Sequence, residues 1–557
     1  MELNIVHLIP EIILLVTACL VCLLGLSSSD LVRRSCQVLA AIACLLGLGV
    51  TIATHYIAVN NGTLQSTQAA LVNFRYYNPQ FITGLACAIG FIMVLISWDM
   101  PARSDPTSTD TRYRGEYFGM MLFSLAGVAM IGKVNDLVWL FIVLELVSIP
   151  TYIMVATGRS QIIAQEAGIK YFFLGALAAA IFLFGFSYIY GATGATRFAD
   201  IREALGGSQM AALNNPLALI GILAVIVGVS FKIAAVPMHF YTPDVYQGAA
   251  TPVTAYLAFA PKTAGIIAII AMLSLFNFNY STPEGYSVMI LLSVMAGLTM
   301  TIGNVLALLQ RNIKRTLAYS SIAHSGYMLV GLAAGPGLVG STGEVGHDGV
   351  LATLFYLGSY AVMNTGAFAV LAYLQGKADA GEDLDDLAGV AREHRGPALM
   401  FALCLFSLIG MPLTVGFVGK LYIVNTALSS GRMALAIIVA VNAAIAAAYY
   451  LKIIGSMYLR EPLYPFSLRR TPAIRAAAII CTVGTIALFF VPTILMLPSW
   501  GYNAHDSASA APLIQPQNAS RLGAVTTPAS ANLRMAIMQS AGSSAPADGL
   551  RNTQFVR

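Results

Sequence analysis

Charged residues are scarce in this chain: Asp, Glu, Lys and Arg make up 10% of its 557 residues, against about 25% in a typical soluble domain. Apolar runs of about 18 or more residues recur along almost the whole length, and such runs are typical of membrane-spanning helices. The runs are continuous, which excludes the alternating strands of a transmembrane β-barrel. The net charge of +5 is spread over short loops, so it indicates no nucleic-acid-binding patch. We therefore expect an all-α polytopic membrane protein.

The sequence also lacks haem, flavin, iron–sulfur and dinucleotide motifs. Among its seven cysteines, Cys19 and Cys22 form a CxxC pair inside a leucine-rich segment, without a second pair. A metal or redox role is one interpretation of this pair, and small buried apolar side chains are the other. The missing second pair favours the latter. We expect no cofactor in this chain, which would then carry no electrons.

The hydropathy pattern predicts about fourteen transmembrane spans. Their predicted limits are 6–26, 36–58, 80–98, 115–132, 136–156, 168–191, 216–237, 249–275, 286–308, 315–335, 349–374, 397–424, 433–458 and 473–497. Glu2 precedes the first span, and Arg33 and Arg34 follow it, so we interpret it as a retained helix and not as a cleaved signal peptide. The segment 498–557 is rich in Ser, Ala, Asn, Pro and Gln, which predicts a disordered extracytoplasmic tail.

Basic residues are distributed unevenly among the predicted loops. The richer set contains Arg33, Arg34, Arg103, Arg112, Arg114, Arg159, Arg311, Lys314, Arg315, Lys377, Arg392, Arg395, Arg460, Arg469, Arg470 and Arg475. The poorer set contains Arg75, Lys133, Arg197, Arg202 and Arg432. The positive-inside rule places the richer set in the cytoplasm and both termini on the extracytoplasmic side. An even number of spans agrees with this arrangement.

Two predicted spans contain helix-breaking residues. Pro237 lies near the end of the seventh, and Gly410, Pro412 and Gly416 interrupt the twelfth. Breaks at matched places in two halves favour inverted repeats with a site at the midplane, although membrane helices also tolerate proline. We predict two inverted-repeat five-helix bundles, spans four to eight and nine to thirteen. The corresponding division is 1–114 (spans one to three), 115–275 and 276–460 (the repeats), 461–497 (span fourteen) and 498–557 (the tail).

Four ionisable residues lie inside apolar segments: Glu145, Lys232, Lys262 and Lys420. Each costs roughly 2.5–3.5 kcal/mol at the centre of a bilayer, and such residues usually mark a proton or ion path. The alternative is snorkelling, in which the ammonium group reaches the membrane interface. Apolar residues extend on both sides of these three lysines, so snorkelling fits them poorly. It fits three other lysines better: Lys133, Lys170 and Lys452.

Neighbouring polar residues extend this set. Glu145 is the natural partner for Lys232, because a lysine whose carboxylate partner comes and goes can load and release a proton. His324 lies among Ser and Tyr residues of the tenth span, where it is either a proton relay or a packed hydrogen-bonding side chain. Glu166 and Lys170, four residues apart, predict an ion pair on a helix surface near the cytoplasmic edge.

Several long stretches resemble the antiporter-like membrane subunits of the bacterial proton-pumping NADH:quinone oxidoreductase (respiratory complex I). The resemblance covers about residues 115 to 460 and is carried by 144–156 (LELVSIPTYIMVA), 166–194, 231–265, 303–332 and 386–422. TPDVYQGAATPVTA (242–255) is similar to the subunit N group, whereas subunits L and M carry an LPDAH-like stretch there. Lys420 also differs from the glutamate of subunit M, and the long lateral helix of subunit L is missing.

The resemblance implies a bacterial inner-membrane protein that translocates protons while quinone is reduced elsewhere in the complex. It implies that Glu145 matches the essential glutamate of the fifth helix, and that Lys232, Lys262 and Lys420 match the lysines of the seventh, eighth and twelfth helices. His324 matches a polar residue of the hydrated axis. FMN, iron–sulfur clusters and quinone are expected in partner subunits. The expected partners are an antiporter-like neighbour, small membrane subunits, lipids and protons, with no nucleic acid.

The sequence departs from the family in two places: the twelfth span has one proline where two are frequent, and the tail is long. Three other functions stay open. A related Mrp-type cation/proton antiporter or membrane hydrogenase is disfavoured by TPDVYQGA. A non-pumping scaffold would tolerate replacement of the buried lysines. The free energy that it costs to keep charged groups inside the membrane disfavours this function. A solute carrier would need a sugar- or amino-acid-binding signature, which we do not find.

Overall fold

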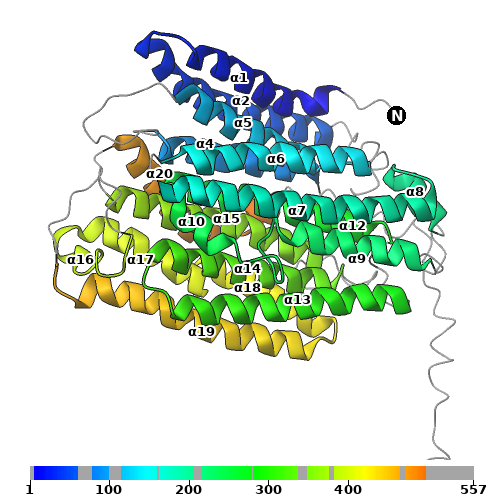
Figure 1. Ribbon diagram of the computed structural model, residues 1–557. Helices are drawn as coiled ribbons and strands as arrows, with labels where there is room; N and C mark the ends of the chain where they lie inside the picture. Colours follow the sequence, from blue (N-terminus) through cyan, green and yellow to red (C-terminus); the bar gives the residue numbers. More distant parts are fainter. Residues whose placement is uncertain are drawn as a thin grey trace, which may run out of the picture. The chain divides into compact units, whose positions relative to one another are not determined.

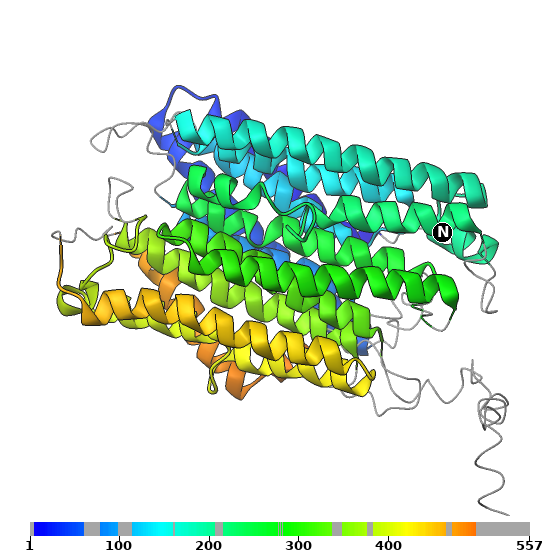
Figure 2. The same ribbon diagram turned by 60° about the horizontal axis from the view of Figure 1, so that its bottom comes forward.

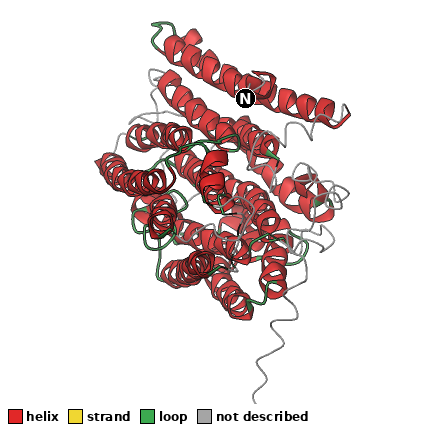
Figure 3. Ribbon diagram, turned by 90° about the vertical axis from the view of Figure 1, so that its right-hand side faces the viewer, coloured by secondary structure: helices red, strands yellow, loops and turns green. Residues whose placement is uncertain are grey.

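The computed structural model describes residues 5–60, 78–98, 114–159, 162–205, 215–276, 278, 280, 282–336, 348–375, 382–463 and 471–496. Within these ranges the chain forms helices and no strand, which confirms the all-α prediction. The long helices lie side by side with their axes in roughly one direction (Figures 1 and 2). Figure 3 shows the same helices from near their ends. The predicted tail, 498–557, lies outside the described residues.

Each predicted span overlaps a helix or consecutive helices. The longer helices are α1 (Ile9–Gly25), α2 (Asp30–Asn60), α4 (Pro79–Ile96), α5 (Arg114–Ile131), α6 (Leu137–Thr157), α7 (Ile162–Thr193), α9 (Pro216–Ser230), α12 (Ala260–Ser274), α13 (Pro283–Leu308), α14 (Ile313–Ala334), α15 (Gly349–Leu374), α17 (Arg395–Ile409), α18 (Val415–Ser429), α19 (Met433–Leu459) and α20 (Pro472–Phe490). The short ones are η1 (Ile5–Leu8), α8 (Phe198–Ala204), α10 (Thr242–Gly248), α11 (Thr251–Leu257), α16 (Val390–Glu393) and α21 (Thr493–Met496).

Helix α14 is the polar centre of the described bundle. Nine segments of the described residues are long and apolar enough to cross a membrane, and five shorter apolar helices accompany them. α14 belongs to neither group, because Lys314, Ser320, Ser321 and His324 reduce its apolar content. Nearly all of its residues are buried, so these side chains face other helices and not lipid.

Asparagine–proline pairs start two of the helices. The side chain of Asn78 accepts a hydrogen bond from a backbone N–H in the first turn of α4, and Asn215 does the same for α9. Pro79 and Pro216 follow at the first helical position, where no N–H is needed and the fixed φ suits the helix.

The seventh span breaks earlier than its proline predicts. α9 ends at Ser230, residues 231–241 form consecutive turns, and α10 begins at Thr242. The predicted limit of 237 is therefore wrong, since Pro237 lies within the turns. Ala234 has φ 54°, in the left-handed region that residues with a side chain rarely adopt. The bend is thus a property of several residues and not of the proline alone.

Side chains of the break itself and of two other helices satisfy the backbone groups that this break frees. Tyr241 donates its hydroxyl to the carbonyl of Phe231 at 2.8 Å, and Ser325 of α14 donates to the carbonyl of Ile233. The N–H of Val236 donates to Thr299 of α13 at 3.0 Å. These partners matter because an unpaired backbone group in an apolar bundle costs several kcal/mol.

The twelfth span breaks where its glycines and proline predict. α17 ends at Ile409, Gly410 has φ 88° and Leu413 has φ 70°, and α18 begins at Val415. A Cβ at Gly416 would lie 1.9 Å from the carbonyl oxygen of Ser407, so only glycine allows this approach. The eighth span is also interrupted, between Leu257 and Ala260, which the sequence did not predict.

Small residues allow α1 and α5 to meet by their backbones. A Cβ built on Gly115 would lie 2.3 Å from Cα of Gly25 and 2.8 Å from the carbonyl oxygen of Val21. One turn later, a Cβ on Gly119 would lie 2.2 Å from the sulfur of Cys22. Close packing through small residues is the usual way in which helices associate within a membrane. Cys19 is exposed, so the expectation of a buried side chain is wrong for this member of the CxxC pair.

We expect Gly115→Val to destabilise the protein, because the backbone of Gly25 cannot move aside as a flexible side chain could. The cost should be about 1–3 kcal/mol, typical of overpacking. Thermal unfolding of the purified complex in detergent measures it. Gly49→Ala is the control, because a Cβ there meets nothing within 4 Å. Equal melting temperatures for Gly115→Val and the native protein would contradict this packing.

Candidate functional site

The first element of the site is an ion pair between α6 and the break that follows α9. Nζ of Lys232 lies 3.2 Å from Oε1 of Glu145 and donates to Oγ of Ser148 at 2.5 Å. Lys232 is 1% exposed and Glu145 is 18% exposed. The rings of Tyr152 and Phe182 lie about 6 Å from the ammonium group. The predicted pairing of Glu145 with Lys232 is therefore present.

Lys262 lies in the first turn of α12, directly after the interruption in the eighth span. Its ammonium group donates to the carbonyl oxygen of Ser321 at 2.6 Å and to Oγ of the same residue at 2.8 Å. It also lies 4.4 Å from the ring centroid of Tyr360. Within the described ranges, no carboxylate lies within ion-pair distance of Lys262. The lysine is thus held by α14 through neutral groups.

A small cavity separates Lys232 from Lys262. Both lysines line it, together with Tyr171, Tyr241 and Tyr246 and neighbouring apolar residues, and it has room for about one water molecule. The hydroxyl of Tyr246 lies 3.4 Å from Oγ of Ser321, the residue that holds Lys262. Tyrosines and apolar side chains therefore both line the space between the two lysines.

His324 continues the polar series one turn along α14 from Ser321. Its Nδ1 is hydrogen-bonded to the hydroxyl of Tyr356 at 2.7 Å, and its Nε2 to that of Tyr450 at 3.4 Å. Tyr450 is in turn hydrogen-bonded to Ser320. Both ring nitrogens therefore have hydroxyl partners, as a relay requires and as a packed histidine also allows.

Lys420 occupies the break of the twelfth span. Its ammonium group donates to the carbonyl oxygens of Leu408 at 2.9 Å and Ile409 at 2.7 Å, at the end of α17. It lies 5.0 Å from the ring centroid of Tyr327, whose own ring is 5.7 Å from that of His324. The tyrosine thus stands between the histidine and the lysine.

Four of the five predicted residues, Lys232, Lys262, His324 and Lys420, are buried, and Glu145 is partly exposed beside Lys232. The structure adds polar residues that the sequence reading did not single out: Ser148, Tyr246, Asn304, Asn442, Tyr449 and Tyr450. Asn304 links α13 to α19, because it donates to Asn442 at 3.0 Å and accepts from Tyr449 at 3.1 Å. Asn304 and Asn442 could have been found from the sequence, because each is an asparagine within an apolar segment. The tyrosines give no such signal, because tyrosine is common in membrane helices.

Three lysines outside the series were expected to snorkel. Lys133 does not: it is 5% exposed and forms an ion pair with Glu11 of α1, which is fully buried and also accepts from Thr83 of α4 at 2.9 Å. Lys170 is 44% exposed and pairs with Glu166 at 2.8 Å, as predicted, and also with Asp244 at 3.2 Å. The snorkelling prediction is wrong for Lys133, because its partner Glu11 lies on a helix that is distant in sequence.

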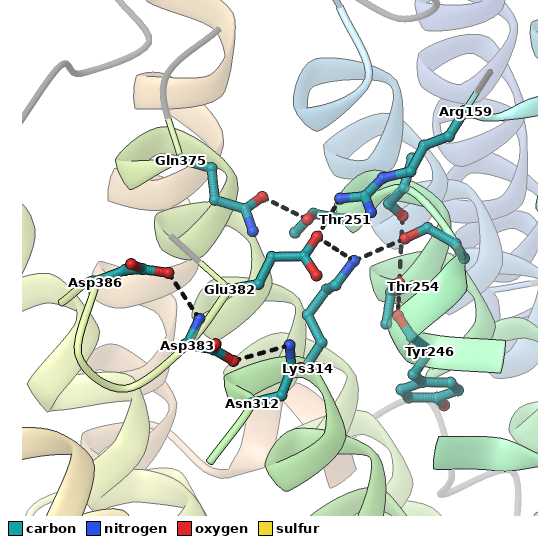
Figure 4. Close-up of polar contacts among 12 residues, drawn as sticks. Arg159, Tyr246, Thr251, Thr254, Asn312, Lys314, Gln375, Glu382, Asp383 and Asp386 are labelled. Carbon is teal, nitrogen blue, oxygen red and sulfur yellow. Dashed lines mark hydrogen bonds and ion pairs between the residues drawn. The ribbon is translucent and has the colours of Figure 1, made fainter. Parts of the chain in front are cut away.

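A second charged group, which we call the Glu382 cluster, comprises Arg159, Lys314 and Glu382 (Figure 4). Oε1 of Glu382 accepts from Arg159 and lies 2.8 Å from Nζ of Lys314. The side chain of Lys314 is 0% exposed, that of Arg159 is 5% exposed and that of Glu382 is 20% exposed. Burial raises the pKa of Glu382, but the adjacent Lys314 and Arg159 lower it further, so that the net shift is downward.

Fold and site together define a class: a polytopic helical membrane protein in which broken helices present buried lysines to a polar central helix. A family model described as "NADH:quinone oxidoreductase/Mrp antiporter, TM" matches residues 134–446. NADH-quinone oxidoreductase subunit N 2 of Rhizobium meliloti (strain 1021) is 37% identical over 68% of this chain and 75% of its own. Subunit N 1 of Solibacter usitatus (strain Ellin6076) is 35% identical over 87% and 94%.

A solved structure agrees with these relatives. A chain of respiratory complex I from Thermus thermophilus with bound aureothin superposes with a TM-score of 0.67 at 28% identity, over 88% of this chain and 98% of that one. The chain described here belongs to the subunit N group of the NADH:quinone oxidoreductase/Mrp antiporter membrane-subunit family.

The pKa of Glu382 predicts a loss of stability in acid. A carboxyl group with a lowered folded-state pKa stabilises the protein above its unfolded value of about 4.3, and this contribution disappears as the pH falls through the folded-state pKa. Melting temperatures measured from pH 7 to below pH 4 should therefore fall more steeply for the native protein than for Glu382→Gln. Parallel curves would show that this carboxylate contributes nothing.

Proposed function

We propose that this chain translocates protons as subunit N of an NADH:quinone oxidoreductase, driven by quinone reduction in another part of the complex. The observation that carries the proposal is the series of Glu145, Lys232, Lys262, His324 and Lys420, in which four members are buried and each has polar partners inside the bundle. Ionisable groups cost free energy inside a membrane, and a connected series of them is typical of a proton path.

Glu145 and Lys232 are the modulated input in this proposal. The side chain of Glu145 is 18% exposed, so a charge on an adjacent subunit can act on it, whereas Lys232 is almost completely buried. Ser148 offers the ammonium group a second acceptor at 2.5 Å. A change at Glu145 therefore alters the electrostatic potential at Lys232 without leaving the lysine unpaired.

Lys262 is the central carrier and Lys420 the exit-side group. The ammonium group of Lys262 belongs to the first turn of α12, where the helix macrodipole places partial positive charge. The ammonium group of Lys420 contacts the last carbonyls of α17, where the macrodipole places partial negative charge. This difference in potential favours the movement of positive charge from Lys262 toward Lys420, with His324 and its hydroxyl partners between them.

Electron transfer takes place in other subunits under this proposal. The chain holds no cofactor, and FMN, iron–sulfur clusters and quinone belong to its partners. Those partners include an antiporter-like neighbour and small membrane subunits, with lipids around them. The buried ionisable groups of the site bond to neighbouring hydroxyl groups, which suits proton transfer.

We place the protein in the bacterial inner membrane with both termini outside the cytoplasm. The loops 99–114, 309–315 and 375–396 are then cytoplasmic. Ion pairs support this grouping, because they join segments that the positive-inside rule puts on the same side. Arg159 pairs with Glu382, and Arg460 pairs with Asp385.

Two alternatives are weaker. An Mrp-type antiporter or membrane hydrogenase shares the family model, but the relatives described above are all subunits of NADH-quinone oxidoreductases. A non-pumping scaffold does not account for Lys262, because an apolar side chain would fill the same position without the cost of a buried charge.

Lys262→Arg tests the carrier role. Arginine keeps the positive charge but does not deprotonate in a protein, so we expect pumping in sealed vesicles to fall by at least tenfold. Lys262→Met, which keeps the approximate volume, should behave alike, and both variants should assemble. Native proton pumping by Lys262→Arg would show that charge alone is sufficient at this position.

Arg311→Cys in a chain without other cysteines tests the topology. A membrane-impermeant thiol reagent should label it in inside-out vesicles and not in right-side-out vesicles. Ser430→Cys, in the exposed turn after α18, should show the opposite pattern. Labelling of residue 311 from the extracytoplasmic side would reverse the proposed orientation.

A further inference from the structure

Glu382 joins parts of the chain that are distant in sequence. It precedes α16 and α17, whereas Arg159 follows α6 and Lys314 lies in the first turn of α14. A single carboxylate oxygen, Oε1, bonds to both cations (Figure 4). The cluster therefore connects a segment of the first predicted repeat with two segments of the second.

One member of the cluster, Lys314, also holds the junction between α10 and α11. Nζ of Lys314 donates a further hydrogen bond, at 2.9 Å, to the carbonyl oxygen of Ala249, the residue that follows α10. Thr251, the first residue of α11, donates to the side chain of Gln375 at the end of α15. Lys314 and Gln375, which belong to the second predicted repeat, thus hold the short connection between α10 and α11 at both ends.

The two short helices that meet at this junction, α10 and α11, both lead to the surroundings of Lys262. α10 carries Tyr246, whose hydroxyl lies 3.4 Å from Oγ of Ser321. α11 leads through residues 258 and 259 into α12, whose first turn contains Lys262. A displacement of the junction would therefore move Tyr246 and Lys262 relative to Ser321, the residue that holds the lysine.

A purely stabilising role accounts less well for this cluster. Three charges in a buried position cost desolvation energy, and apolar residues of similar volume often stabilise a protein equally well. Charged, multiply bonded groups differ from apolar ones in fixing one geometry, and the geometry fixed here is that of the segment that carries Tyr246.

We propose that Glu382 is a positioning residue for proton transfer at Lys262, which it serves by holding the α10–α11 junction against α14. The inference rests on the proposed function, because it assigns to Lys262 a role in proton transfer. The Glu382 cluster is the fixed point from which Tyr246 and Lys262 are both aligned on Ser321.

The test compares Glu382→Gln, Glu382→Asp and Asp385→Asn in sealed vesicles that contain the assembled complex. Proton pumping and NADH:quinone turnover are both measured per assembled complex, so that lost assembly does not count as lost pumping. We expect Glu382→Gln to reduce the protons moved per electron severalfold, since misplacement by about 1 Å can cost on the order of 10²-fold in rate. Glu382→Asp, which keeps the charge with a shorter reach, should fall between this variant and the native protein.

Asp385→Asn is the matched control. Asp385 lies three residues away in the same connection, its side chain is 61% exposed, and it pairs with Arg460 at the surface. Its replacement should leave the proton-to-electron ratio unchanged. Equal ratios for Glu382→Gln and Asp385→Asn would overturn the proposal. If Glu382→Gln does not assemble, Glu382→Asp decides, and a native ratio for that variant overturns it.

A double-variant cycle with Tyr246→Phe identifies the route. If Glu382 acts by aligning Tyr246 and Lys262, adding Glu382→Gln to Tyr246→Phe should reduce pumping by less than it does in the native background. Fully additive effects would overturn the proposed route. Lys262→Arg in the same type of vesicle distinguishes failure of the proposed function from failure of the positioning role. If Lys262→Arg pumps normally, the proposed function is wrong. If Lys262→Arg fails to pump while the Glu382 variants pump normally, only the positioning role is wrong.

Discussion

Each break of a helix inside a membrane frees backbone groups that must find partners, and the architecture of this protein depends on how they do so. In the seventh span the partners are side chains of α13, α14 and the break itself. In the twelfth span the partner is Lys420, which donates to the carbonyls of Leu408 and Ile409. The ammonium group of Lys420 thus has two roles: it satisfies the last carbonyls of α17, and it is also a member of the polar series.

Lys232 and Lys420, the lysines at the two breaks, consequently differ in the kind of group that they contact. Lys232 faces a carboxylate that is partly exposed, so its surroundings can change with events outside the chain. Lys420 faces backbone carbonyls, whose charge does not change. Lys262 donates to the backbone carbonyl and to the hydroxyl of a single residue, Ser321. The three lysines therefore have chemically different surroundings, and the differences reside in the residues that each lysine contacts.

The sequence predicted the buried ionisable residues, because charge is conspicuous where nearly everything else is apolar. It also predicted the break at Gly410 and Pro412, since both residues act locally on the backbone. It did not predict where α9 ends, because the backbone beyond Ser230 is bonded to Thr299 and Ser325, which lie on helices distant in sequence. Lys133 was misjudged for a related reason: its partner Glu11 is on a different helix.

Glu382 could not be predicted at all from its surroundings in sequence. It lies in a stretch of acidic loop residues, where a solvated carboxylate is the ordinary expectation. Only the fold shows that it meets Arg159 and Lys314 in a buried position. Tyr246 and Tyr450 were missed because a tyrosine in a membrane helix gives no local sign of whether its hydroxyl bonds to lipid, backbone or a site residue.

The composition of α14 bears on how the chain is made. This helix is too polar to count among the apolar segments that can cross a membrane, yet it is buried almost throughout. α13 precedes it and packs against it closely, since a Cβ at Gly326 would lie 2.8 Å from the backbone nitrogen of Met300. A helix of such composition gains little free energy from entering lipid on its own. We therefore expect its insertion to depend on neighbours such as α13, so the helix on which the site is built relies on other helices to reach its place.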